Sequence, residues 1–142
     1  MVAFLDKSLK KEIVHAITLA EKMTSGEIRV HIQSKCKDDV FGEGKKIFHK
    51  LKMYKTKKRN GVLVFIALDS KRFAIVGDSG IHEKVGDDFW NETRDKMTGY
   101  FKKNQIKDGI IIGINDIGEK LKKYFPKKLD DKNELSNTLS EE

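Results

Sequence analysis

The chain has little of the covalent reinforcement on which small secreted proteins depend. Its 142 residues include one cysteine, Cys36, and one proline, Pro126. A single cysteine excludes an intramolecular disulfide and is typical of a protein from a reducing compartment. The chain is nevertheless long enough to bury a core without disulfides or structural metals, and 38% of its residues are hydrophobic.

Long apolar runs and a leader-type N-terminus are also missing. The longest apolar stretches, residues 62–68 and 110–114, are far shorter than the ~20 residues that a membrane-spanning helix needs. The first residues lack a basic segment followed by an apolar stretch and a small-residue cleavage site. We therefore expect a soluble, cytoplasmic protein with no membrane span.

Several strong catalytic signatures are absent from the sequence. There is no phosphate loop of the type GxxxxGK[ST], no HExxH and no GxSxG. Cys36 has no neighbouring histidine in the sequence, so we interpret it as a half-buried small side chain. The four histidines lie in separate expected elements and do not suggest a zinc site; they are His15, His31, His49 and His82.

Basic residues outnumber acidic ones, with 29 Lys and Arg against 22 Asp and Glu, a net charge of +7. The lysines are scattered along the sequence, which is typical of a solvated surface. We therefore expect no nucleic-acid partner. Residues 127–142 differ from the rest in composition, because they include three lysines, five acidic residues and few apolar residues. This composition predicts a flexible charged tail over 127–142 behind a domain spanning 1–126.

Hydrophobic periodicity predicts seven elements in the order α-β-α-β-β-α-α. The run at 110–112 is also compatible with a strand, but helical spacing continues to Leu121. The predicted elements are a helix from Asp6 or Ser8 to Gly26, a strand over 27–33, a helix starting at 42–44, strands over 62–68 and 73–76, a helical turn over 81–85, a helix capped by Asp87 or Asp88 with Trp90 on its core face, and a helix from 108 to 125 that Pro126 ends.

This order of elements defines a fold class. A helix between the first two strands makes them parallel, and the two-residue turn Asp69-Ser70 adds an antiparallel strand. Helices before and after the strands must cover both faces of the sheet. The predicted fold is of the α/β class: a three-layer α/β/α sandwich whose small mixed sheet combines a parallel β-α-β unit with an antiparallel hairpin strand.

Three stretches, taken in order, resemble the TPM domain family. Residues 24–30 read TSGEIRV, and residues 60–77 read NGVLVFIALDSKRFAIVG. Residues 78–88 and the later Asp108-Gly109 are similar to the family's glycine loop, its following aspartate and the start of its last helix. The sequence departs from the family at 77–80, which reads GDSG where many relatives place an aromatic residue between two glycines, and in lacking an export signal and membrane anchor.

The resemblance to a stand-alone, soluble TPM phosphatase-like protein has consequences for function. It implies an α/β/α fold, binding of a divalent metal, calcium in particular, and in some members a weak acid phosphatase activity. Other members serve as accessory modules of membrane complexes. The chain is therefore expected to be either a metal-dependent phosphomonoester hydrolase or a non-enzymatic module that binds metal or an acidic partner without turnover.

The topology sorts the acidic residues into the two ends of the sheet. The carboxyl ends of the parallel strands should gather Asp38, Asp39, Asp69 and Asp108. Carboxylate oxygens suit Ca²⁺ or Mg²⁺, and ligands of open α/β sheets favour this end. We therefore predict a divalent metal there, with a phosphorylated small molecule as substrate. The predicted catalytic residues are Asp69 and Lys71, with Arg72 as the alternative to Lys71. The protein is expected to be a monomer.

The opposite end of the sheet is the alternative metal site. The candidate ligands at that end are Glu27, Asp78, Asp87 and Asp88, near Glu83, Arg59, Asn60 and His82. At both ends, local structural roles are a second interpretation. Each of these aspartates, and each of those at the first end, could instead be a turn residue or a helix cap.

Overall fold

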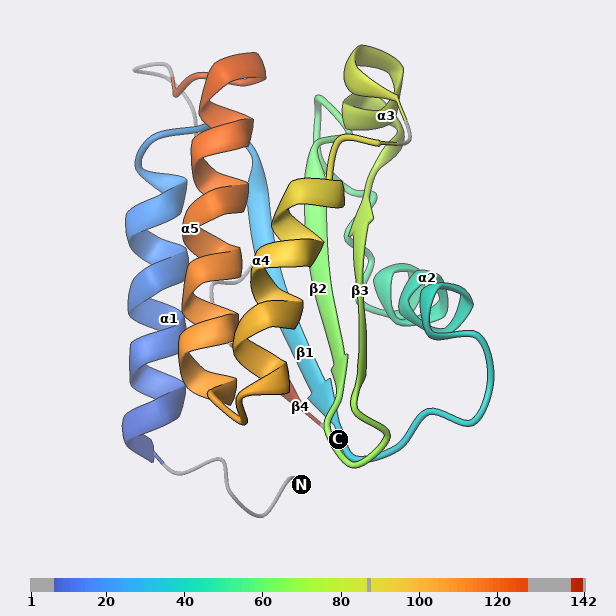
Figure 1. Ribbon diagram of the computed structural model, residues 1–142. Coiled ribbons are helices and arrows are strands. Elements are labelled where there is room, and N and C mark those ends of the chain that lie inside the picture. The colour runs from blue at the N-terminus through green and yellow to red at the C-terminus, as the bar shows by residue number, and fades with distance from the viewer. Residues whose placement is uncertain (1–6, 87, 128–138, 142) are drawn as a thin grey trace.

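The computed structural model describes residues 7–86, 88–127 and 139–141, which form a mixed sheet between two helical layers (Figure 1). The predicted order of helices and strands is confirmed, with two additions: the helical turn predicted over 81–85 is a helix of its own, and a further strand lies at the end. The elements are α1 (Lys7–Glu21), β1 (Glu27–Gln33), α2 (Val40–Lys50), β2 (Gly61–Ala67), β3 (Arg72–Gly77), α3 (Ser79–Val85), α4 (Asn91–Lys102), α5 (Ile106–Tyr124) and β4 (Ser140–Glu141).

The sheet has the strand order β3-β2-β1-β4. β1 and β2 are parallel, in a register that runs from Glu27 opposite Gly61 to Gln33 opposite Ala67. β3 is antiparallel to β2, as the two-residue turn predicts. Every residue of β2 is buried, because a central strand covered on both faces must be apolar on both. The predicted α/β sandwich is confirmed.

The two faces of the sheet are covered unequally. α1, α4 and α5 lie against one face, and α2 lies alone against the other (Figure 1). The larger cluster of buried side chains includes Ile13, Ile17 and Ile114, and the smaller one is built around Phe48 and Phe65. None of the helices in the described part of the chain is both long and apolar enough to cross a membrane.

Three helices start at other residues than the sequence predicts. α2 begins at Val40, after its cap Asp39, instead of at 42–44. α4 begins after Trp90 and has no side-chain cap, while Asp88 precedes it in a turn; Asp87 lies outside the described residues. α5 begins at Ile106, so that Asp108 falls in its first turn instead of capping it. Ile106 packs against the larger buried cluster, which favours a helix that starts early enough to present this side chain.

The last residues depart from the predicted flexible tail. Ser140 and Glu141 form β4, which pairs in parallel with His31 and Ile32 of β1. The side chains of Ser140 and His31 are 2.9 Å apart, Oγ to Nδ1. A strand of two residues has no periodicity to read, so composition alone could not predict it. Residues 128–138 lie outside the described part, and their predicted flexibility stays a prediction.

Deleting residues 139–142 should lower the stability of the domain slightly. The deletion removes the β1–β4 pairing and one of the hydrogen-bond partners of the buried His31 ring, together about 1 kcal/mol. For a domain of this size, that corresponds to a fall of about 3–4 °C in the melting temperature. Ser140→Ala, which removes only the side-chain bond to His31, should show part of the loss. An unchanged melting temperature in both variants would mean that β4 adds nothing to the fold.

Candidate functional site

A cavity of about 930 Å³ opens at the end of the sheet that the sequence favours, where the parallel strand β2 ends. Four parts of the chain surround it: the end of β2 with its turn into β3, the end of α4, the loop into α5, and the start of α1. The lining residues include Leu9, Ile66, Asp69, Lys71, Arg72, Phe73, Phe101, Lys102, Ile106, Lys107 and Asp108. Ligands of open α/β sheets bind at this end of parallel strands.

The floor of the cavity is apolar. The rings of Phe73 and Phe101 meet edge to face, with centroids 5.2 Å apart and an interplanar angle of 84°. Leu9 and Ile66 come from the buried cluster itself, and Ile106 is half-buried beside them. A floor of this kind removes an aromatic or aliphatic group from water.

The rim of the cavity is cationic. It carries four basic residues against two acidic ones, Asp69 and Asp108. Two of the cations are tethered: Arg72 donates from Nη1 to the carbonyl oxygen of Asp38 at 2.8 Å, and Lys107 lies 3.6 Å from the carboxylate of Glu12. The others are Lys71 and Lys102, both exposed at the rim.

The N-terminus of α5 opens into this rim. Its N-cap residue, Gln105, makes no side-chain capping hydrogen bond, so the first amide groups of a 19-residue helix are open to a ligand. These amides and the helix dipole favour an anion such as phosphate. α2 also begins at this end, but Asp39 caps it by accepting a hydrogen bond from the amide of Gly42 at 3.0 Å. The N-terminus of α2 is therefore partly satisfied by its own cap, whereas no side chain caps α5.

The four aspartates predicted to hold a metal do not come together. Asp69 and Asp108 line the cavity, whereas Asp38 and Asp39 do not. The loop with Asp38 and Asp39 turns toward α2, on the face of the sheet opposite α5 (Figure 1). Throughout residues 7–86, 88–127 and 139–141, no three Asp, Glu, His or Cys side chains are grouped so that they could hold a metal ion.

The carboxylates of the alternative end have structural roles. Asp78 caps α3 through Ser79 N at 2.7 Å and accepts two hydrogen bonds from Arg59, at 2.8 and 3.0 Å. Asp88 is exposed, and its side chain accepts from Asn91 at 3.3 Å. Glu27 is buried in β1. These contacts explain Asp78 and Asp88 without a metal.

One buried acidic residue near that end, Glu21, was not among the candidates predicted from the sequence. Glu21 is 8% exposed, and its Oε2 accepts a hydrogen bond from the amide of Ile28 at 2.7 Å. Burial raises the pKa of its carboxyl group to about 8, and the neighbouring Glu27 adds to the rise, against the opposite effects of the Ile28 amide and Lys127. The signal was readable: Glu21 follows Ile17 by four residues and so continues the apolar stripe of α1.

One family model and two solved structures are similar to this chain. The family model described as the TPM domain matches residues 1–120. The NMR structure of the BA42 protein from the psychrophilic bacterium Bizionia argentinensis is 48% identical and superposes with a TM-score of 0.92, over 98% of this chain and 96% of that one.

A more distant structure supports the fold alone. The N-terminal domain of a protein from P. gingivalis, also solved by NMR, is 16% identical and has a TM-score of 0.68, over 85% of this chain and 78% of that one. A search of curated proteins gave no match. The comparisons therefore establish the family and the fold of this chain.

Proposed function

Because the chain belongs to the TPM domain family, we propose that it binds a phosphorylated small molecule, together with a divalent cation, in the cavity between the β2–β3 turn and the start of α5. One observation carries this proposal: the uncapped N-terminus of α5 opens into a cationic rim above an apolar floor. A phosphate ester has the matching parts, an anionic head and an organic group. A monomeric state and a cytoplasmic location stay predictions.

Different residues of the cavity contact different parts of such an ester. The first amides of α5 donate hydrogen bonds to phosphate oxygens. Lys71 and Lys102 add positive charge at the rim, where partial exclusion of water strengthens their attraction for an anion. Phe73 and Phe101 contact the organic group from below. An aromatic or aliphatic phosphate ester should therefore bind more tightly than inorganic phosphate.

The carboxylates present fit a cation that arrives with the phosphate better than a resident calcium ion. Ca²⁺ takes 6–8 oxygen ligands, whereas Mg²⁺ is commonly held by one or two carboxylates and by substrate phosphates. Asp69 and Asp108 supply two carboxylates at the cavity. When bound, such a cation neutralises charge on the phosphate and lowers the pKa of a bound water. Calcium with the same two ligands is the weaker form of the proposal.

Turnover through this site should be slow. Within the described lining of the cavity there is no serine, cysteine or histidine, so that its one hydroxyl side chain, Thr98, has no histidine there to activate it. Hydrolysis would depend on water, with Asp69 positioning it or protonating the leaving group and Lys71 holding the phosphate. The same observation favours the second candidate function, an accessory module that binds the ester and cation without turnover.

A chromogenic ester separates the two functions. We expect slow hydrolysis of 4-nitrophenyl phosphate, faster with Mg²⁺ or Ca²⁺ and suppressed by a chelator. Asp69→Asn should lower the rate by about 10²-fold, the size of a general acid–base contribution. Asp38→Asn is the matched control, because Asp38 is exposed at the same end of the sheet but outside the cavity; it should retain the wild-type rate.

Binding must be measured beside the rate. One outcome is that phenyl phosphate binds, that Asp69→Asn makes this binding less dependent on Mg²⁺, and that no ester is hydrolysed. The accessory function is then correct. If neither binding nor hydrolysis is seen, the cavity is not a phosphate-ester site and the proposal fails.

A further inference from the structure

The positive charge of this chain is concentrated in one segment. Residues 44–68 contain seven lysines and one arginine but no aspartate or glutamate. The rest of the chain has 21 basic and 22 acidic residues, a net charge of −1. The lysines are therefore not evenly scattered, which corrects the interpretation from the sequence. All eight cations are exposed: Lys45, Lys46, Lys50, Lys52, Lys55, Lys57, Lys58 and Arg59.

These eight residues, called here the basic layer, lie on α2 and on the turns that connect it to β2. The same segment covers one face of the sheet with the buried side chains of Ile47, Phe48 and Met53. Because its apolar side chains point at the sheet, its cations are forced outward. Figure 1 shows α2 and the turns after it on the side of the sheet opposite α1, α4 and α5, and the exposed cations of the basic layer belong to these elements.

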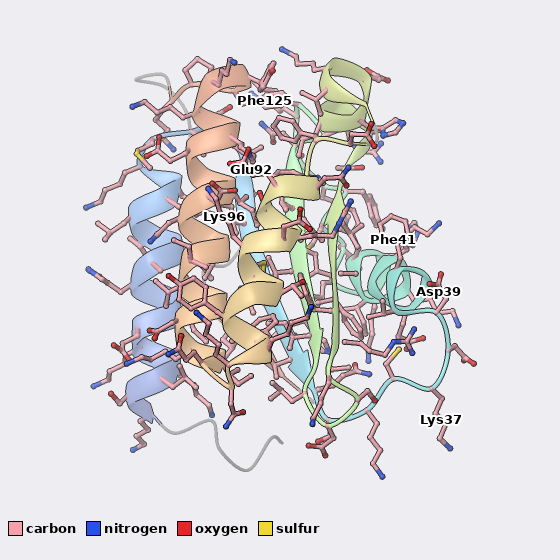
Figure 2. The ribbon with its side chains drawn as sticks, viewed as in Figure 1. Lys37, Asp39, Phe41, Glu92, Lys96 and Phe125 are labelled. Carbon is pink, nitrogen blue, oxygen red and sulfur yellow. The ribbon has the colours of Figure 1, made fainter. Side chains whose placement is uncertain are left out.

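The helices on the other side of the sheet balance their charges differently. On α4 and α5, Lys96 lies 2.9 Å from Asp116 and 3.2 Å from Glu92. Lys120 is within 3.9 Å of the same aspartate and 3.8 Å of the same glutamate. Figure 2 labels Glu92 and Lys96 on this side. Ion pairing neutralises that surface. In the basic layer, Lys46 lies 3.8 Å from Glu43 and Arg59 lies 2.8 Å from Asp78, but residues 44–68 themselves contain no acidic residue against their eight basic ones.

An exposed aromatic residue lies beside the basic layer. Phe41, in the first turn of α2, is 44% exposed, and it lies on the α2 side of the sheet (Figure 2). The ammonium group of Lys45 is 5.2 Å from the centre of its ring. A large apolar side chain next to clustered lysines is the combination found where proteins contact the boundary between lipid headgroups and acyl chains.

We propose that the basic layer, with Phe41, docks the domain on an anionic lipid bilayer. Lysine clusters are attracted to anionic headgroups, and their effects accumulate over several residues. Seven of the eight cations are lysines, which suit a diffuse anionic surface; reading nucleic-acid bases relies more on the bidentate geometry of arginine. One face of the Phe41 ring is covered by Lys45, which disfavours base stacking there. Docking uses none of the residues that line the cavity.

Vesicle binding tests the proposal on the whole chain. The protein should bind vesicles of phosphatidylcholine mixed with phosphatidylglycerol, should not bind vesicles of phosphatidylcholine alone, and should be released by added salt. The triple change Lys45→Gln, Lys46→Gln, Lys55→Gln should weaken binding about 100-fold, on the ordinary contribution of a lysine near an anionic surface. All three side chains are exposed, so the melting temperature should be nearly unchanged.

A second triple variant controls for total charge. Lys11→Gln, Lys22→Gln, Lys122→Gln removes the same charge from α1, the turn that follows it, and α5, where the side chains are also exposed, and should bind like the wild type. Equal losses in both triple variants would overturn the proposal, because net charge alone would then explain binding. Phe41→Ser should weaken binding to anionic vesicles severalfold. A protein that binds an oligonucleotide duplex but no vesicle would also overturn it.

Discussion

Replacing Trp90 by alanine lowers the free energy of unfolding by about 3–5 kcal/mol, the cost of deleting a large buried aromatic side chain. Trp90 is 7% exposed and packs edge to face on Phe89, with ring centroids 4.6 Å apart. Its indole Nε1 is also 3.2 Å from the position that a Cβ on Gly77 would take. The ring therefore joins the start of α4 to the end of β3. Urea unfolding measures the loss.

Tyr100→Ala is the matched control for this prediction. Tyr100 is an aromatic residue of the same helix region but is 36% exposed, so its removal should cost much less, about 1 kcal/mol or below. If Trp90→Ala were as mild as Tyr100→Ala, Trp90 would not be part of the core, and its indole would have to serve a surface contact instead.

Between pH 5 and pH 8 the domain should lose stability through Glu21. Its carboxyl group has a pKa of about 8 in the folded protein and an ordinary value, near 4.5, once unfolded. Below the lower value both states are protonated. As pH rises toward 8, the unfolded chain releases this proton while the folded one still holds it, so unfolding becomes easier. At about 1.4 kcal/mol for each unit of pKa, the loss is roughly 2–4 kcal/mol.

Glu21→Gln removes this dependence while keeping an oxygen that accepts from the Ile28 amide. We expect the variant to melt like the wild type near pH 4.5 and to be more stable by roughly 2–4 kcal/mol above pH 8. Glu119→Gln, at an exposed position of α5, should follow the wild type at every pH. A wild type whose melting temperature did not change with pH would show that Glu21 ionises normally within the fold.

Most of the fold could be predicted from the sequence because its signals are periodic. The apolar stripe of α1, the alternation of β1 and the unbroken apolar run of β2 each admit one main interpretation. β4 was missed because a pairing of two residues depends on the neighbouring edge of β1, and the residues of β4 do not themselves indicate it. The starts of α4 and α5 shifted by two to three residues, because packing of Trp90 and Ile106 outweighed the aspartates as caps. α2 starts before the glycines at 42–44 because Asp39 caps it.

The site could be predicted in part. Topology brought Asp69 and Asp108 to one end of the sheet, as it had to, since both follow elements that end there. Topology does not determine which way a loop turns. The loop carrying Asp38 and Asp39 precedes α2 and turns with it to the other face of the sheet. The apolar floor of the cavity was also invisible, because Phe73 and Phe101 are 28 positions apart in the sequence and meet only after α4 packs on β3.

Changes in amide chemical shifts test directly whether the cavity at the start of α5 binds a phosphate ester. With phenyl phosphate and Mg²⁺ added stepwise to the labelled protein, the account predicts the largest shifts in residues 69–73 of the β2–β3 turn and 104–109 around the start of α5. The Asp69→Asn variant should show them only at higher Mg²⁺. Shifts centred on Glu27 and Asp78 at the opposite end, or no shifts at all, would contradict the account.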